Sequence, residues 1–330
     1  MIDVQRLAVL REVARAGSFA GAAAALRHTP SAVSQQIAAL ERGAGIVLVE
    51  RSTRGVTLTD AGRLLLETAD TVHAELLAAD RQLRELREQG PPTLTVVTFP
   101  SAGEPLLAPA LTALTGAPTE GPSGEGDKHV DITVIEAEPD DALIALRDGV
   151  ADLALLYHLH VPQPPRRWAS VAGPGRYTPL VTERFSLVVP PTHRLADRDR
   201  VDLAEFADER WIQGWGEPGS VLDALAAIRG FRPQVACRSS DYRFMTALVA
   251  AGVGVTLMPE LALVGGDAVR RLAIDPETTR HVGAYLPRRQ WRNRAADRLL
   301  AALRNRAQAL AGPPPPRGSS TPARMNSQEM

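Results

Sequence analysis

Two short helical stretches separated by a tight turn, near the start of the chain, constrain its fold more than any other feature. They occupy residues 18–26 and 29–41. Ser18 can cap the first by accepting a hydrogen bond from a free backbone N–H, and Thr29 can cap the second in the same way. Pro30, at the first position of the second helix, loses only an amide that has no helical partner. The pattern predicts a helix-turn-helix.

The second of these helices has one apolar and one polar face. Val33, Ile37 and Leu40 stand at i, i+4 and i+7, so they share a buried face. The opposite face carries short or amide-bearing side chains, which let a helix enter the major groove: Ser31, Ala32, Ser34, Gln35 and Ala38. Because glutamine can pair bidentately with adenine, this face is predicted to read bases.

A basic, glycine-containing turn follows between two short extended segments within residues 48–62, which is the pattern of a wing. Its side chains can hold phosphates or place an arginine in the minor groove. An alanine-rich pair of helices alone is more often structural, but helices and wing in this order favour DNA binding. The candidate DNA-binding residues are Ser18, Thr29, Ser31, Ala32, Ser34, Gln35, Arg51, Thr53, Arg54 and Thr57.

Residues 2 to about 62 resemble the winged helix-turn-helix domain of LysR-type transcriptional regulators. The matching motifs are Gly17-Ser18-Phe19, Ser31-Ala32-Val33-Ser34-Gln35-Gln36-Ile37, Leu40-Glu41, Glu50-Arg51 and Leu58-Thr59-Asp60-Ala61-Gly62. Two positions depart from the family: Val49 stands where an aromatic residue is usual, and His28 where an apolar one is commoner. Neither lies on the base-reading face. The resemblance implies a bacterial DNA-binding regulator with residues 1–60 as its DNA-binding domain.

One long helix is predicted from Thr59 to about Glu88. Its apolar positions alternate at spacings of four and three, as in a coiled-coil seam. They are Leu65, Ala69, Val72, Leu76, Ala79, Leu83 and Leu86. An amphipathic helix packed on its own domain would show the same stripe. We favour pairing with a second copy, because about thirty residues span roughly 45 Å, too long for a small winged domain to cover.

Residues 61–89 are therefore expected to be the dimerising linker helix, as the resemblance also implies. Such a dimer sets two recognition helices on one face of double-stranded operator DNA. The choice between dimer and tetramer is left open.

The 330 residues are enough for more than one folded unit. Gly90-Pro91-Pro92 marks a hinge. After it, strands and helices alternate in βαβ fashion and predict a largely parallel sheet, with a second set of strands from Phe185. Residues 115–128 and the tail at 311–330 are expected to be disordered.

Residues 90–310 resemble the effector domain of LysR-type regulators, which is similar to periplasmic binding proteins. The segments 149–155 and 242–259 carry this likeness. The expected fold class is α/β with an N-terminal all-α winged helix-turn-helix, a long linker helix and a two-lobed effector-binding domain. Lobe 1 would contain about 93–162 and 266–310, and lobe 2 about 163–265.

In open α/β sheets, ligands bind beyond the carboxyl ends of strands, where helix N-termini offer free amides. Small residues after the first strand would let a carboxylate approach such amides, and Ser101 is the leading candidate. The effector-binding candidates are Ser101, Ala102, Gly103, Tyr157, His158, Gln213, Trp215, Ser239 and Ser240. We expect a small-molecule effector of unknown identity, with organic acids as one candidate class, and no other cofactor.

The composition limits the other functional classes. A net charge of −1 argues against a protein that simply coats nucleic acid. The single cysteine, Cys237, excludes an internal disulfide framework and fits a reducing cytoplasm. No apolar run reaches membrane-spanning length, so a cytosolic protein without a membrane partner is expected.

Catalytic motifs are weak in this sequence. His158 and His160 lack a third ligand at a recognised spacing, and Gly252-x-Gly254 lacks the third glycine of a dinucleotide fingerprint. We expect no metal site and no enzymatic activity. The alternative is a two-lobed small-molecule-binding protein or enzyme with an incidental helical N-terminus, which would have no DNA affinity. Operator sequence, activation or repression, and RNA polymerase as a further partner are left open.

Overall fold

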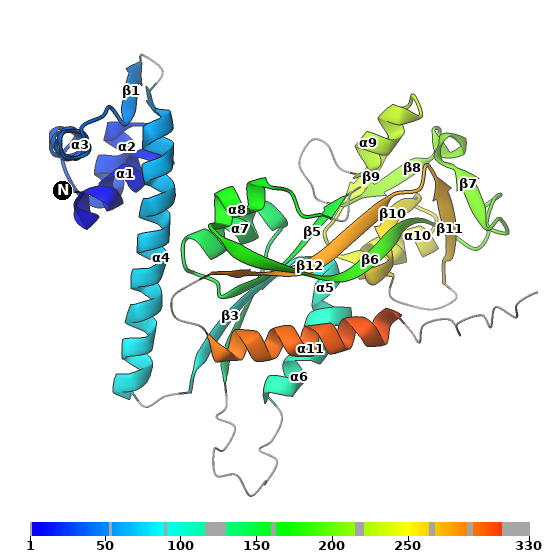
Figure 1. Cartoon of the computed structure of the whole chain (residues 1–330). Helices are drawn as coiled ribbons and strands as arrows, with labels where there is room; N and C mark the ends of the chain where they lie inside the picture. Colours follow the sequence, from blue (N-terminus) through cyan, green and yellow to red (C-terminus); the bar gives the residue numbers. More distant parts are fainter. Residues whose placement is uncertain are drawn as a thin grey trace, which may run out of the picture.

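The computed structural model shows a small helical unit at one end of a long helix and a larger α/β unit beside that helix (Figure 1). We call them the winged unit, residues 2–58, and the two-lobed unit, residues 91–311. The structure describes residues 2–52, 55–88, 91–115, 130–159, 163–214, 221–263, 268–288 and 293–311.

The winged unit contains three helices and a two-stranded antiparallel hairpin, in the predicted order. The Ser18 hydroxyl accepts from the Gly21 N–H at 3.1 Å, and the Thr29 hydroxyl accepts from the Ala32 N–H at 3.2 Å. Both predicted N-caps are confirmed. The elements are α1 (Val4–Ala16), α2 (Phe19–Leu26), α3 (Pro30–Ala44), β1 (Val49–Ser52) and β2 (Gly55–Leu58).

One apolar core joins these elements. Leu10, Val33 and Ile37, from α1 and α3, are fully buried in it. Gly17 ends α1 with a left-handed backbone, φ +62°, as a C-terminal glycine commonly does. Its carbonyl oxygen accepts from the Val56 N–H at 2.9 Å, so the wing is attached to the turn between α1 and α2.

Helix α4 (Asp60–Glu88) has 29 residues, about 43 Å at 1.5 Å per residue, and confirms the predicted long helix. Its first two stripe positions differ from the expected dimer seam. Leu65 and Ala69 are buried in the core of the winged unit. This part of α4 is therefore the amphipathic helix packed on its own domain, because the apolar surface of the three short helices covers it.

The rest of the stripe has a different environment. Leu76 and Leu83, seven residues apart, are 56% and 65% exposed, whereas Val72 and Ala79 are half-buried. The side chain of Leu86 lies outside the described residues. Only this second part of the stripe is free to meet a partner copy.

The main sheet of the two-lobed unit has eight strands in the order β4-β3-β5-β12-β6-β11-β7, and β10 also pairs with β6. A second sheet of two parallel strands, β8 and β9, meets it through a bridge between Trp211 and Val255. The strands are β3 (Thr93–Thr98), β4 (Asp131–Glu136), β5 (Leu153–Leu159), β6 (Gly175–Val189), β7 (Arg200–Asp202), β8 (Arg210–Gln213), β9 (Gln234–Arg238), β10 (Thr256–Pro259), β11 (Arg270–Asp275) and β12 (Thr279–Pro287).

The prediction of a largely parallel sheet is wrong at its centre. Parallel pairing joins β3 to β4 and β5, and β7 to β11. By contrast, β12 pairs antiparallel with β5 and β6, and β6 pairs antiparallel with β10 and β11. The reason is the 15-residue length of β6, which belongs to both lobes, whereas the sequence placed a strand only from Phe185.

Helices cover both faces of the lobe 1 strands. Residues of β3 alternate between the faces, so Val96 packs with η1, α6 and α11, whereas Val97 packs with α7 and α8. The helical elements are α5 (Pro100–Ala102), η1 (Gly103–Leu107), α6 (Ala108–Thr115), α7 (Pro139–Arg147), α8 (Arg167–Ala172), η2 (Leu203–Phe206), α9 (Val221–Ile228), α10 (Tyr242–Ala250), η3 (Glu260–Ala262) and α11 (Arg294–Ala311).

Within the described part of the chain, no helix has both the length and the apolar character that a membrane span requires.

Gly62 provides a test of how α4 is seated on the winged unit. A Cβ at this position would overlap the Leu48 carbonyl oxygen, which belongs to the start of the wing. We expect Gly62→Ala to destabilise the winged unit by about 1–3 kcal/mol, the usual cost of overpacking. Urea unfolding followed by circular dichroism measures it. The control is Gly103→Ala, where a Cβ would meet no atom within 4 Å, and equal effects of the two variants would contradict this packing.

Candidate nucleic-acid interface and candidate ligand site

The polar face of α3 is turned to solvent. Ser31 and Gln35 are exposed, and Ala32 and Ser34 are partly exposed, whereas the apolar residues of α3 lie in the core. Side chains on one exposed face of a helix can reach base edges in a major groove. The predicted base-reading residues therefore lie together, with the surface that such contacts need.

Arg51 has a more defined place than the sequence indicated. Its guanidinium donates to the Ser34 hydroxyl at 3.0 Å and lies 4.7 Å from the centre of the Phe19 ring. Arg51 thus joins the wing to both helices of the helix-turn-helix and brings a positive charge beside α3. Thr57, on β2, is exposed. Thr53 and Arg54 lie outside the described residues.

Glu41 positions the wing, a role that sequence reasoning missed. One carboxylate oxygen, Oε1, accepts from the backbone N–H groups of Leu48 at 2.9 Å and Val49 at 3.2 Å. The orientation of the wing relative to α3 therefore depends on a charge-assisted contact from α3 itself. The Leu40-Glu41 motif marked this residue in the sequence, but the sequence alone did not show which backbone amides the Glu41 carboxylate contacts.

In the two-lobed unit, Ser101 lies at the end of β3 in a buried polar cluster. The Arg280 guanidinium donates to the Ser101 hydroxyl at 2.8 Å and to Glu183 Oε1 from Nε at 2.8 Å. The Arg280 and Glu183 side chains are 3% and 1% exposed. A second Glu183 oxygen, Oε2, accepts from the Leu261 N–H at 2.6 Å. Ser101 thus faces a guanidinium whose charge is already balanced.

Aromatic rings surround this guanidinium. Its carbon lies 5.0 Å from the ring centre of Phe99, 4.8 Å from that of Tyr157 and 5.8 Å from that of Phe185. The Tyr157 hydroxyl donates to Glu138 at 2.8 Å. Burial, together with the Glu138 carboxylate, raises the pKa of Tyr157, so this hydroxyl stays a neutral donor.

Lobe 2 contributes the N-terminus of α10 to the same place. Tyr242 lies close to the Ser101 hydroxyl and to Arg280, and burial raises the pKa of Tyr242. The neighbouring Arg243 donates to Glu104 of η1 at 2.6 Å and 2.8 Å. An exposed ion pair therefore joins the start of α10 to η1, so the two lobes meet next to Ser101.

The backbone amides after Ser101 differ from the prediction. The Ala102 N–H donates to the Phe99 carbonyl at 3.1 Å, and the Gly103 N–H donates to the Pro100 carbonyl. The chain makes a tight single turn there before the π-helix η1, so these amides are used within the turn. The polar contacts described at Ser101 are therefore made by side chains.

His158, another predicted effector-binding residue, does not join this cluster. It follows Tyr157 on β5, and successive residues of a strand point to opposite faces. The His158 ring stacks on His281 at 5.3 Å and lies 5.4 Å from Trp168, on the face covered by α8. Sequence alone could not decide which of the two adjacent residues faces the ligand side.

The other lobe 2 candidates build the loop before α10. The Gln213 side-chain amide donates to Asp223 at 3.0 Å, and the backbone carbonyl of Gln213 accepts from the Ser239 N–H at 3.0 Å. The Ser239 hydroxyl accepts from the Asp241 N–H at 3.0 Å, and Ser240 is exposed. These residues set the position of α10 rather than reaching Ser101 directly. Trp215 lies outside the described residues.

Across the described ranges, no three His, Cys, Asp or Glu side chains are grouped to hold a metal ion.

Comparisons with known proteins divide the chain as the structure does. The family model described as "Bacterial regulatory helix-turn-helix protein, lysR family" matches residues 4–63, and the one described as "LysR substrate binding domain" matches residues 87–308. An uncharacterised HTH-type transcriptional regulator of Mycobacterium tuberculosis is 32% identical over 273 residues, 80% of this chain and 82% of the relative. The HTH-type transcriptional regulator CfxR of Cupriavidus necator is 30% identical over 263 residues, 78% of this chain and 75% of the relative.

Solved structures show the same overall fold. ArgP from Mycobacterium tuberculosis is 23% identical with a TM-score of 0.56, over 93% of this chain and 98% of that one. An OxyR mutant from Corynebacterium glutamicum is 26% identical with a TM-score of 0.51, over 94% of this chain and 96% of that one.

The buried ion pair can be tested by removing one partner. Arg280→Met leaves the Glu183 carboxylate buried without its guanidinium, so we expect a loss of about 3–5 kcal/mol in unfolding free energy. Urea unfolding followed by tryptophan fluorescence measures it. Arg198→Met is the matched control, because Arg198 is 55% exposed in its contact with Glu205 and should cost less than about 1 kcal/mol. Similar losses of unfolding free energy in both variants would show that the buried pair contributes no more to stability than an exposed one.

Proposed function

Because the chain belongs to the LysR family of DNA-binding transcriptional regulators, we propose that it binds operator DNA as a homo-oligomer and that a small molecule beside Ser101 alters this binding. The family consists of regulators, not enzymes. One observation carries the proposal: a single chain combines an exposed polar face on α3 with a buried polar site where two lobes meet. A DNA partner places the protein in the bacterial cytoplasm.

On the DNA side, Ser31, Ala32 and Gln35 read bases from α3. Arg51 rests on Phe19 and Ser34, so it reaches the backbone beside the recognition helix from a fixed position. Thr57, Thr53 and Arg54 hold phosphates on the flank of the site. Ser18 and Thr29 cap their helices and place helix N-termini toward the phosphates, where free amides favour an anion.

Oligomerisation uses the outer part of α4. The exposed Leu76 and Leu83 stand one heptad apart, and Ala79 lies between them, with Val72 and Leu86 continuing the stripe. Pairing α4 with a second copy buries these leucines and sets two α3 helices on one face of the duplex, as a two-fold operator requires.

The ligand site favours a particular class of organic acid. One guanidinium, Arg280, stands against two carboxylates, Glu183 and Glu138, in the chain of contacts around Tyr157. Because Glu183 already balances Arg280, every ligand carboxylate has to be buried here without a counter-charge, so a second carboxylate adds a second such cost. We infer a monocarboxylate or a zwitterion, with its carboxylate near the hydroxyls of Ser101 and Tyr242 and its apolar part among the rings. Such a ligand changes DNA binding only if it binds the open and closed lobes unequally.

Base reading is tested with Gln35→Ala. If Gln35 makes a bidentate contact, its loss removes about 1–3 kcal/mol of preference for operator over scrambled DNA, whereas Arg54→Ala weakens both duplexes alike. Fluorescence anisotropy with the upstream intergenic DNA of its own gene and a scrambled duplex, at two salt concentrations, measures this. Gln5→Ala, an exposed amide on α1, is the matched control. If the wild-type protein bound both duplexes equally and lost both at the higher salt concentration, this result would count against sequence-specific recognition.

The ligand class is tested by thermal unfolding with monocarboxylates, zwitterionic amino acids and dicarboxylates. A ligand present at a hundred times its Kd stabilises the folded protein by about 2.7 kcal/mol, which is a measurable rise in Tm. We expect such rises from the first two classes only, and their loss in Ser101→Trp. Unchanged operator affinity of Ser101→Trp shows that the variant is folded. A ligand that stabilises wild type and Ser101→Trp equally would place its site elsewhere.

A further inference from the structure

Helix α7 has a functional contact at each of its ends. Its N-cap residue, Glu138, accepts the hydrogen bond of Tyr157, whose ring packs on Arg280 in the candidate ligand site. Its other end carries Arg147 and Asp148, which contact the winged unit and the long helix. Nine residues of helix separate the two ends, about 13 Å.

At that second end, four charged side chains of alternating sign form a cluster that we call the charge clamp: Arg11, Asp70, Arg147 and Asp148. Arg11 of α1 donates from Nε to Asp70 of α4 at 2.6 Å and also bonds Asp148. Arg147 Nε lies 3.0 Å from Asp148 and 3.8 Å from Asp70. All four side chains are only 13–28% exposed. The clamp thus joins the winged unit, α4 and the two-lobed unit at one point.

The charges of the clamp are maintained. Burial alone would raise the pKa of Asp148, but hydrogen bonds and charges from Arg147 and Arg11 outweigh it and lower that pKa. Burial and the positive charge of Arg11 lower the pKa of the nearby His73, so this ring adds no charge at neutral pH. The contact between the units is therefore one between full charges.

The body of α7 is packed as a rigid piece. Ala142, Leu143 and Leu146 are buried in one apolar cluster with Val97 of β3 and Trp168 of α8. Close-packed apolar clusters transmit displacement because their side chains cannot rearrange freely. A shift of Glu138 at one end of α7 is thus carried to Arg147 at the other.

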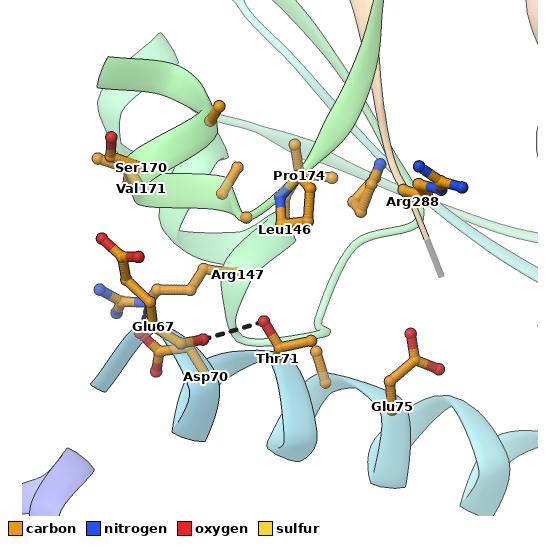
Figure 2. A pocket seen from close by; sticks show the side chains of 15 residues that line it. Glu67, Asp70, Thr71, Glu75, Leu146, Arg147, Ser170, Val171, Pro174 and Arg288 are labelled. Atoms are coloured by element: carbon orange, nitrogen blue, oxygen red, sulfur yellow. Dashed lines mark hydrogen bonds and ion pairs between the residues drawn. The ribbon is translucent and has the colours of Figure 1, made fainter. Parts of the chain in front are cut away.

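The junction that the clamp holds is not completely filled by side chains. An open pocket lies between α4 and the two-lobed unit. Figure 2 shows Glu67, Thr71 and Glu75 of α4 on one side of it, and Leu146 and Pro174 on the other. The apolar cores on the two sides form separate clusters, so they do not join the units into one core. Docking of this kind can be released without unfolding either unit.

We propose that α7 links the ligand site to the charge clamp, so that a change at Tyr157 loosens or tightens the docking of the winged unit and α4 on the two-lobed unit. The link to an effector rests on the proposed ligand site beside Ser101. The coupling between Tyr157 and the clamp is a property of the protein alone, and it is testable without ligand or DNA.

The experiment is amide hydrogen exchange of the full-length protein, read by mass spectrometry over α1 and over residues 66–78 of α4. Asp148→Asn removes one charge of the clamp and should speed exchange there roughly fivefold, as expected when one charged contact is lost. Tyr157→Phe keeps the ring and removes only the hydroxyl that bonds Glu138. We expect it to speed exchange in the same α4 segment, at the far end of α7. The matched control, Tyr177→Phe, removes a hydroxyl beside His158 and should leave α4 unchanged.

The double variant Tyr157→Phe with Asp148→Asn decides whether the two ends act through one path. A shared path predicts exchange in α4 no faster than in Asp148→Asn alone. Tyr157→Phe effects confined to β5 and the start of α7, or fully additive effects in the double variant, would overturn the inference. Either result leaves the ligand site intact. Conversely, the two variants could show coupled exchange while no organic acid alters DNA binding. That result would overturn the effector role and leave the coupling between Tyr157 and the charge clamp in place.

Discussion

The buried contact between Arg280 and Glu183 is the interaction on which the two-lobed architecture depends. These residues lie on β12 and β6, which pair antiparallel at the centre of the main sheet. From there, Arg280 reaches Ser101 of lobe 1, and Glu183 reaches the backbone of Leu261. A buried ion pair is stabilising only when its remaining donors and acceptors are satisfied, and here each partner has further contacts. The same contacts place a polar site at the point where the lobes meet.

The chain uses two kinds of joint, and their difference explains how regulation can work. Inside the winged unit, the start of α4 is buried with the short helices in one apolar core. Between that unit and the two-lobed unit, the contacts include partly exposed charges beside an open pocket. An apolar core holds its parts in one arrangement, whereas a junction of partly exposed charges separates at lower cost. The arrangement of the helices within the winged unit is thus fixed, whereas the position of that unit relative to the two-lobed unit can change.

Several assignments were possible from the residues alone because they depend on local rules. Ser18 and Thr29 cap the helices that follow them, as expected from their side chains and the backbone amides nearby. The burial of Val33, Ile37 and Leu40 follows from helical spacing. The stripe on α4 was ambiguous, since period alone does not say whether Leu65 faces its own core or a partner. The antiparallel centre of the sheet was also missed, because pairing depends on residues far apart in sequence.

The sequence by itself determined the helix-turn-helix, the wing, the long helix and the alternation of strands and helices, because capping, periodicity and turn chemistry act over a few residues. Only the tertiary structure decided that Ser101 faces Arg280 from 179 residues away, and that Tyr157 shares this site while His158 does not. It also decided that Arg11 meets Asp148. These contacts depend on how β6 and β12 pair and on how α4 lies on α7. These are long-range consequences of packing, and no local pattern encodes them.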